Sequence, residues 1–307
     1  MTVKIIGAGL AGLLAANTAF QDSIILETQN EDSFKKHTAL LRFRSPKIGI
    51  ALGIDFKEIT VHKNIYAGCK LYNHSDIFFA NSYSKKVNGI IEDRSIWNLE
   101  TTKRWIAPEN FHDLLLERCK NRIQWGASPD FTEMLADKGD QLFINTAPLP
   151  SILNALNIGF DGNEFKSSSI NVERYIIKDC NVYQTIYFPE VDFNCYRASI
   201  SGNILTIESI GDITEYEFEN ITALFNIDQN EMVQLGSNCQ ILGKISPIDN
   251  EWRKNKLFEL THFYNVYSLG RFATWRQILL DDVLNDIYVI KKLMNTGFYE
   301  KSMAIAN

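Results

Sequence analysis

The stretch Val3-Lys4-Ile5-Ile6-Gly7-Ala8-Gly9-Leu10-Ala11-Gly12-Leu13-Leu14-Ala15-Ala16 places three glycines between an apolar strand and a helix of small residues. Gly7 permits a tight turn out of the strand, Gly9 lets the backbone approach a pyrophosphate, and Gly12 lets the helix lie close to the sheet. The free amides and positive dipole end of the helix favour phosphate groups. The pattern predicts a dinucleotide-binding loop made by Gly7, Ala8, Gly9, Leu10, Ala11 and Gly12.

Glu27 ends the next apolar run, Ile24-Ile25-Leu26, and lies 20 residues after the first glycine. A carboxylate at this spacing can hold a ribose hydroxyl. The alternative for the same stretch is a secretory signal, with Lys4 in front of an apolar segment. The three glycines would break the helix of such a segment, and no convincing small-residue cleavage site precedes Gln21. We therefore favour the dinucleotide site.

Length and composition limit the class of protein. The chain has 307 residues, of which 45% are hydrophobic, enough for one large domain or two interleaved ones. No apolar run approaches 18 residues, so we expect no membrane partner. The cysteines are scattered, without metal-ligand spacing, which predicts reduced thiols, no metal site and a cytoplasmic protein. They are Cys69, Cys119, Cys180, Cys195 and Cys239.

Charge is unevenly distributed. The net charge of −6 argues against general polyanion binding, but residues 31–104 carry thirteen Lys or Arg against eight Asp or Glu. A local basic face can meet an anionic substrate, nucleic acid included. The alternative is ordinary solvated charge on strands and loops.

The predicted elements change character along the chain. Both ends predict alternating strands and helices, whereas the middle predicts short strands and an antiparallel sheet. The short strands are expected at residues 65–72, 77–83 and 95–100, and the sheet strands at 172–178, 182–188, 194–200 and 203–209. The remaining expectations are strands at 123–125, 141–145, 240–245 and 265–269 and helices at 108–122, 214–225, 250–263 and 281–294.

This order predicts an α/β fold with two domains. A Rossmann-like dinucleotide-binding domain is expected to be discontinuous, with an antiparallel-sheet substrate domain inserted into it. The first comprises residues 1–58, 105–160 and 240–307, and the second comprises residues 59–104 and 161–239.

A second anchor lies near the C-terminus, in Ser268-Leu269-Gly270-Arg271-Phe272-Ala273-Thr274-Trp275, followed by Asp281 and Asp282. The segment is an apolar strand, a glycine that permits close approach, an arginine, and a helix whose amides one of the two acids can cap. It resembles the C-terminal flavin-binding segment of UDP-galactopyranose mutases and their amine-oxidase-like relatives, and Asn145-Thr146-Ala147-Pro148 resembles the same superfamily's strand end near the cofactor.

This resemblance implies the glutathione-reductase-like fold, with FAD held from both ends of the chain. Glu27 would serve the adenosine half and the C-terminal helix the flavin half. Besides the glycine loop and Glu27, the implied cofactor-binding residues are Arg42, Thr146, Ala147, Gly270, Arg271, Asp281 and Asp282.

The sequence departs from the mutase pattern at two places, which argues against a galactopyranose mutase. The adjacent tyrosines of the mutases are replaced by Gln277 and Ile278, and the nearest candidate for their flavin-side histidine, His37, lacks the Gly-Gly loop. The small size of the chain resembles that of phage-encoded FAD enzymes that tailor hypermodified thymidines, which would work in the host cytoplasm.

The candidate catalytic residues each have a plainer alternative. Arg42 and Arg44 alternate on a strand and can clamp an anion, or are surface arginines. Tyr187 and Arg197 lie on neighbouring predicted strands and can form one wall of a substrate site, or pack as ordinary sheet residues. The full set is His37, Arg44, Tyr187, Arg197, Lys244 and Trp275, where Lys244 resembles the lysine of flavin amine oxidases and Trp275 is either flavin-side or core.

Three functions follow from these patterns. The first is an FAD-dependent enzyme that oxidises a carbon next to an amine nitrogen and cleaves the C–N bond, with a small anionic or amine substrate such as a glycine-type adduct on thymidine in DNA. The second is a redox-neutral mutase acting on a nucleotide-sugar. The third is a non-catalytic flavin or dinucleotide-binding module.

Overall fold

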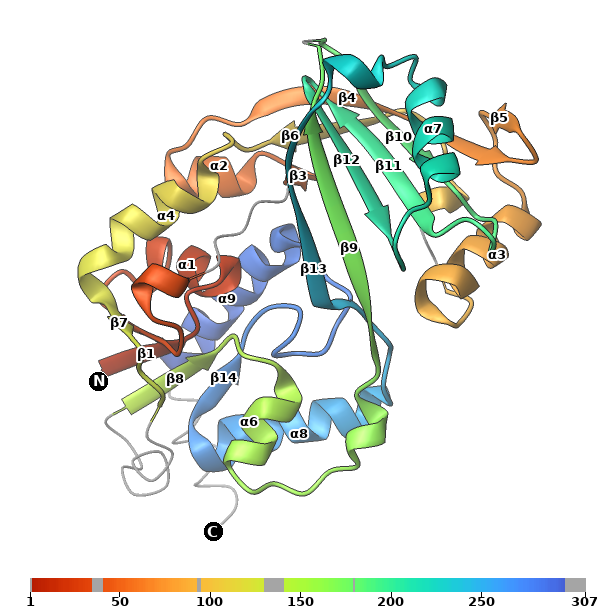
Figure 1. The fold of residues 1–307 in the computed structure, drawn as a ribbon. Coiled ribbons are helices and arrows are strands. Elements are labelled where there is room, and N and C mark those ends of the chain that lie inside the picture. The colour runs from red at the N-terminus through yellow and green to blue at the C-terminus, as the bar shows by residue number, and fades with distance from the viewer. Residues whose placement is uncertain (1, 35–40, 93–94, 130–140, 179, 296–307) are drawn as a thin grey trace. The chain divides into compact units, whose positions relative to one another are not determined.

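The computed structural model describes residues 2–34, 41–92, 95–129, 141–178 and 180–295 (Figure 1). The chain divides into two units. Unit 1 comprises Met1–Lys57, Trp105–Phe165 and Pro247–Asn307, and unit 2 comprises Glu58–Arg104 and Lys166–Ser246. Residues 240–246 therefore lie in unit 2 and not in the dinucleotide-binding domain predicted from the sequence. The reason is that strand β13 continues to pair with β9 as far as Ile245.

Unit 1 is built on a sheet of five parallel strands in the order β14-β8-β1-β2-β7. The strands are β1 (Thr2–Ile6), β2 (Ile24–Glu27), β7 (Ile123–Trp125), β8 (Gln141–Asn145) and β14 (Val266–Ser268). The chain moves outward from β1 in one direction through β2 and in the other through β8. A reversal of strand order at β1 places the crevice used by ligands in open α/β sheets at the carboxyl end of this strand. The strands predicted at 123–125, 141–145 and 265–269 are confirmed in this sheet.

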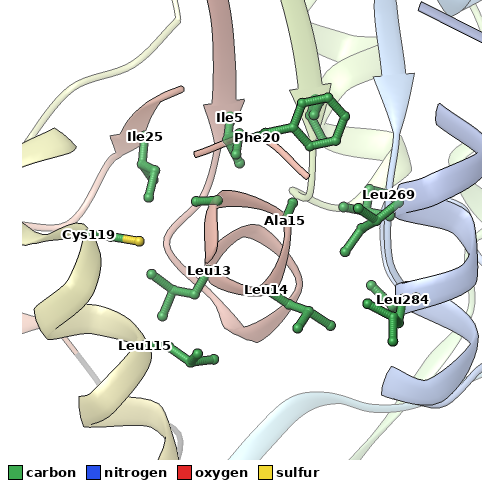
Figure 2. Close-up of a cluster of buried hydrophobic side chains, with 14 of the residues drawn as sticks. Ile5, Leu13, Leu14, Ala15, Phe20, Ile25, Leu115, Cys119, Leu269 and Leu284 are labelled. Carbon is green, nitrogen blue, oxygen red and sulfur yellow. The ribbon is translucent and has the colours of Figure 1, made fainter. Parts of the chain in front are cut away.

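Helix α1 (Leu10–Asn17) is the centre of the core of unit 1 (Figure 2). Its residues Leu13, Leu14, Ala15 and Ala16 are all buried. In Figure 2, Leu115 and Cys119 of α4 (Phe111–Cys119) lie on one side of α1, and Leu284 of α9 (Leu280–Asn295) lies on the other. The small alanines let α1 pack between two helices and the sheet at once.

The other elements of unit 1 differ in length. Helix α4 begins three residues later than predicted, and a 3-10 turn follows it at Lys120–Arg122. The remaining elements are α2 (Lys47–Leu52), α6 (Leu149–Ala155), α8 (Asn250–Tyr264) and β3 (Arg42–Phe43), which pairs with the last residues of β6 (Thr102–Ile106). None of the helices in the described part of the chain is long and apolar enough to cross a bilayer.

Unit 2 contains a mixed sheet, in which β13, β9, β12, β11, β10 and β4 follow one another. Its strands are β4 (Lys57–Ala67), β9 (Ser167–Ile176), β10 (Tyr183–Tyr187), β11 (Cys195–Ser201), β12 (Ile204–Ser209) and β13 (Val233–Ile245), with β5 (Lys70–Tyr72) paired to β4. The four consecutive strands predicted around residues 172–209 are confirmed. The sheet is not purely antiparallel, because β4 and β10 pair in parallel. That pairing joins residues 122 positions apart, so it cannot be predicted from the spacing rules of hairpins.

Each face of this sheet has its own apolar cluster. One cluster contains Ile186, Ala198 and Leu205 with Ile221 of α7 (Glu215–Leu224). The other contains Ile65, Val172, Tyr187 and Tyr196 with Tyr83 and Val87 of α3 (Ile77–Asn88). We call the second side the α3 face.

Helix α3 corrects the strand predicted at residues 77–83. Its buried positions Ala80, Tyr83, Ser84 and Val87 follow the helical spacing, and Asp76 caps the helix by accepting a hydrogen bond from the Phe79 amide at 2.8 Å. The aromatic and apolar residues of this stretch suggested a strand. The cap and the spacing were the signals that sequence reasoning missed. The predicted strand at 95–100 is likewise a 3-10 turn, Ser95–Trp97.

Lys86 ties α3 to the turn between β10 and β11. Its ammonium donates to the carbonyl oxygens of Phe188, Glu190 and Cys195, each at 2.8 Å. These three bonds use all three donors of an ammonium group. Burial lowers the pKa of Lys86 to about 8, and the three hydrogen bonds make the side chain a structural link within unit 2.

Truncation of the α1 core should destabilise unit 1 strongly. We expect Leu13→Ala to lower the free energy of unfolding by about 2–5 kcal/mol, because a fully buried leucine loses its contacts and leaves a cavity. Chemical denaturation followed by circular dichroism measures the change. The control Ile50→Ala, at a side chain 74% exposed on α2, should cost less than about 1 kcal/mol. Equal losses in both variants would contradict this packing.

Candidate functional site

The glycine loop after β1 packs so tightly against its neighbours that two of its glycines leave no room for a side chain. Gly7 has a φ of +97°, its amide donates to the Leu26 carbonyl at 2.8 Å, and a Cβ added to it would lie 2.7 Å from Oγ1 of Thr146. A Cβ on Gly12 would collide with the carbonyl oxygen of Gly7. Both positions therefore require glycine for reasons internal to the protein.

Gly9 differs from these two glycines. Its φ of −70° and ψ of 173° are open to any residue, and a Cβ placed on it would meet no described protein atom within 4 Å. It is the N-cap of α1 and supplies no side-chain cap to that helix. The first amides of a helix have no intrahelical acceptor and attract anions. The space beside Gly9 and these amides thus fits a phosphate group.

Glu27 is only 6% exposed and holds the glycine loop from the next strand. Its carboxylate accepts hydrogen bonds from the amide of Ala8 at 2.8 Å and from the amide of Gln29 at 2.9 Å. The sequence did not suggest this bond to the loop. The Thr28 hydroxyl also donates to this carboxylate, at 3.4 Å. A carboxylate has about four acceptor positions, so these three bonds leave room for a ribose hydroxyl. The ribose role of Glu27 stays a prediction.

The carboxyl ends of β1, β8 and β14 bring remote parts of the chain together. Thr146 donates to the Ile6 carbonyl through its amide at 3.0 Å and its hydroxyl at 2.6 Å. The Leu269 amide donates to the Asn145 carbonyl at 2.8 Å. Gly270 has a φ of +92°, and a Cβ on it would lie 2.9 Å from that of Ala11. The predicted residues of the first loop, of Thr146-Ala147 and of Gly270 therefore form one cluster.

The two acids at the start of α9 hold the segment after β3. Asp281 accepts hydrogen bonds from the amides of Arg44 at 3.1 Å and Ser45 at 3.2 Å. Asp282 accepts from the Leu279 amide at 3.0 Å, which caps α9, and pairs with the Arg44 guanidinium. Burial alone would raise the pKa of Asp282, but the Leu279 amide and Arg44 lower it below its usual value. Asp282 is thus the helix cap, and Asp281 is a tether.

The predicted arginine clamp has a different geometry. Strand β3 ends at Phe43, so Arg42 and Arg44 do not continue one strand. The Arg44 side chain is 46% exposed and is paired with the acid at position 282. We correct the expectation that both arginines share one strand face. His37, the candidate that precedes them, lies outside the described residues.

Trp275 packs inside unit 1. It is 3% exposed, and its ring meets that of Phe165 edge-on at 4.9 Å between centroids. Its φ of +45° is rare for a bulky residue. The geometry supports the core alternative for Trp275 over a flavin-side role. Its neighbour Arg271 lies over the ring of Phe272 at 5.5 Å.

Unit 2 holds the other predicted catalytic residues. Tyr187 and Arg197 are directly paired across β10 and β11, as expected from neighbouring strands. Arg197 also faces Glu208 on β12 and forms a two-bond ion pair with it, with Nη2 at 2.6 Å from Oε1. The Tyr196 hydroxyl donates to the same carboxylate at 3.1 Å, and the Lys244 ammonium lies 4.8 Å from the Tyr196 ring centre.

Glu208 is the residue that sequence reasoning did not place. The turn at Gly202-Asn203 joins β11 to β12 and sets the register that puts Glu208 opposite Arg197. Burial alone would raise the pKa of Glu208, but the charge and hydrogen bonds of Arg197 lower it. The guanidinium of Arg197 is therefore compensated by a carboxylate of its own unit.

Comparison with known proteins shows the fold. No family model matches the chain, and no curated protein matches its sequence. The structure is similar to that of reduced UDP-galactopyranose mutase, with a TM-score of 0.66 and 14% identity over 97% of this chain and 94% of that one. It is also similar to an oxidoreductase from Methanosarcina mazei, with a TM-score of 0.58 and 10% identity over 95% of this chain and all of that one.

A third similar structure is a ternary complex of aklavinone-11 hydroxylase with FAD and aklavinone. Its TM-score is 0.53 and its identity 11%, over 95% of this chain and 62% of that one. The chain therefore shares the fold of a mutase and of oxidoreductases. Its activity has to be argued from its own residues.

Substitutions at Gly12 and at Gly9 should have different effects on the free energy of unfolding. We expect Gly12→Ala to lower the free energy of unfolding by about 2 kcal/mol or more, because the added methyl group collides with the Gly7 carbonyl. Gly9→Ala should cost no more than about 1 kcal/mol, because it changes only the N-cap preference of α1. Urea denaturation of both variants checks this. A loss in Gly9→Ala as large as in Gly12→Ala would show that packing explains all three glycines.

Breaking the ion pair of unit 2 should cost stability in a pH-dependent way. We expect Arg197→Met to lose up to about 3 kcal/mol at pH 7, since a mostly buried carboxylate is left without its cation. The folded pKa of Glu208 lies below its ordinary 4.5, so its contribution is present above that pH and is lost as pH falls through the folded pKa. The difference from wild type should therefore shrink in acid. The double variant Arg197→Met/Glu208→Gln should recover part of the loss, and no recovery would contradict the coupling.

Proposed function

We propose that the chain binds FAD and is a flavoenzyme of the glutathione-reductase-like fold. The observation that carries this proposal is the cluster at the carboxyl ends of β1, β8 and β14, where the glycine loop, Thr146 and Gly270 meet. The fit of a phosphate group beside Gly9 supports it, because no packing contact there demands a glycine. The shared fold with an FAD-bound hydroxylase adds to this support.

The residues of unit 1 divide into two groups in this proposal. The amides of the glycine loop would hold the pyrophosphate and Glu27 the ribose of the adenosine half. Ala147, Gly270 and Arg271 would serve the flavin half. Asp281 contributes by tethering the backbone of Arg44 and Ser45 to the start of α9, as its hydrogen bonds indicate.

We propose an oxidative C–N bond cleavage as the reaction. FAD would supply the acceptor for a hydride from the carbon next to an amine nitrogen. Water adds to the resulting imine carbon, the C–N bond breaks, and an amine and a carbonyl compound leave. Lys244, held against the Tyr196 ring and near the Glu208 carboxylate, is our candidate for binding that water. The chain would be an oxidoreductase or lyase of the amine-oxidase-like group.

The substrate we propose is an amino-acid-modified thymidine in DNA, cleaved to leave an aminomethyl group. The excess of basic residues between positions 31 and 104 supports an anionic substrate. The phage-type resemblance of a chain of this size points in the same direction.

A redox-neutral mutase is the second candidate. The similarity to reduced UDP-galactopyranose mutase over nearly the whole of both chains favours it. Gln277 and Ile278, at the positions where the resemblance expects tyrosines, weigh against a nucleotide-sugar substrate. A third hypothesis is a flavin-binding module without catalysis. It predicts no reaction with amines and no conversion of UDP-galactopyranose.

The reaction can be tested by anaerobic mixing of the purified protein with candidate amines, glycine-modified thymidine DNA included. We expect bleaching of the oxidised flavin absorbance and release of glyoxylate, with an aminomethyl group left on the base. Unmodified DNA of the same sequence is the matched control. Absence of bleaching with every amine would overturn the oxidative proposal. Conversion of UDP-galactopyranose after dithionite reduction, without net electron flow, would establish the mutase instead.

A further inference from the structure

A line of polar residues crosses the sheet of unit 2 from strand to strand. The registers pair Lys63 of β4 with Thr185 of β10, Thr185 with Ser199 of β11, Ser199 with Thr206 of β12, and Thr206 with Arg174 of β9. Figure 1 shows the strands that carry them. We call these five residues the polar row. It begins and ends with a cation and has three hydroxyls between.

All five side chains belong to the α3 face. Residues two positions away in the same strands, among them Ile65, Tyr187 and Val172, belong to the apolar cluster of α3. The residues between, such as Ile186, Ala198 and Leu205, belong to the cluster of α7 on the other side. Side chains alternate between the two faces of a strand, so the polar row shares the side of the α3 cluster.

The hydroxyls of the row confirm this arrangement and show an incomplete network. Thr185 Oγ1 and Ser199 Oγ lie 3.0 Å apart, so they form a hydrogen bond across the two strands. Thr206 Oγ1 is buried and has no hydrogen-bond partner among the described residues. A buried hydroxyl is expected to be paired. The hydroxyl of Thr206 is thus left unsatisfied by the described part of the chain.

Cations lie at both ends of the row, Lys63 at one end and Arg174 at the other. Lys63 donates a hydrogen bond to the Asn98 carbonyl at 2.9 Å. Burial and the nearby Arg104 lower the pKa of Lys63, and the opposite effect of Glu100 is smaller. Two positions from Ser199 and Thr206 on the same strands, the positive charge of Arg197 is compensated by Glu208. An anion placed beside Lys63 would offset the repulsion between Lys63 and Arg104.

We propose that the polar row is a binding site for an anionic, hydroxyl-bearing ligand whose acidic groups are phosphates or carboxylates. Neighbouring strands lie about 4.8 Å apart, so the row extends over about 19 Å from Lys63 to Arg174. Cations at the two ends bind the acidic groups, while hydroxyls both donate to and accept from the hydroxyls of the ligand. The row lies within unit 2, so this binding does not require FAD. Under the proposed function, the ligand is the acidic part of the substrate.

The test is isothermal titration of the purified full-length protein with three probes. Thymidine 5′-monophosphate carries phosphate and hydroxyls, glucuronate carries carboxylate and hydroxyls, and a short oligothymidylate carries phosphates on a DNA strand. We expect at least one probe to bind. Lys63→Gln and Arg174→Gln should each weaken that binding about tenfold or more, and Thr206→Val about threefold. Binding of the oligothymidylate alone identifies a DNA strand as the source of the phosphates.

Matched controls separate the row from general electrostatics. Lys70→Gln removes one positive charge from exposed β5, and Thr60→Val removes a hydroxyl from an exposed position of β4. Both should stay within about twofold of wild type. Thermal unfolding of each variant shows that the fold is retained, and the flavin spectrum reports separately on the cofactor. The proposal is overturned if no probe binds at millimolar concentration, or if the row variants bind like the controls.

Discussion

The close approach of α1 to the turn after β1 is the constraint on which unit 1 depends. Gly12 faces the carbonyl oxygen of Gly7 with no room for a methyl group, so helix and turn form one rigid piece. Thr146 and Gly270 then pack against this piece from β8 and from the segment after β14. Glu27, at the end of β2, accepts a hydrogen bond from the Ala8 amide and so fixes the loop. A loop held in this way keeps its amides in a fixed orientation toward an anion, which is the physical basis of phosphate binding.

Unit 2 differs from unit 1 in that polar and charged groups lie within its packed sheet face. Its sheet has apolar clusters on both faces, but the α3 face also carries an ion pair, a buried tyrosine hydroxyl and the polar row. Buried charges are tolerated there because each has a partner of opposite sign or several hydrogen bonds, as Arg197, Glu208 and Lys86 show. Polar groups in such a setting are costly unless they are paired. The unsatisfied hydroxyl of Thr206 on this face therefore supports ligand binding on that side.

Local patterns predicted much of unit 1 from the sequence. The glycine loop, the parallel strands and the approach of Gly270 follow from residue spacing and short apolar runs. Long-range pairing could not be predicted in the same way. The parallel contact of β4 with β10 and the tether of Asp281 to Arg44 join residues more than 100 positions apart. Helix α3 was missed for another reason, because aromatic content outweighed the Asp76 cap and the helical spacing of its buried residues.

Identification of the bound cofactor tests the central claim most directly. The purified protein and its Gly9→Val variant are denatured by heat, and the released small molecules are identified by mass spectrometry and absorbance. We predict FAD at close to one equivalent per chain in the wild type. The variant should lose most of it while largely keeping its thermal stability, because a Cβ at position 9 meets no described protein atom within 4 Å. A wild-type protein that neither carries flavin nor binds added FAD, or a variant that retains it fully, would contradict the claim.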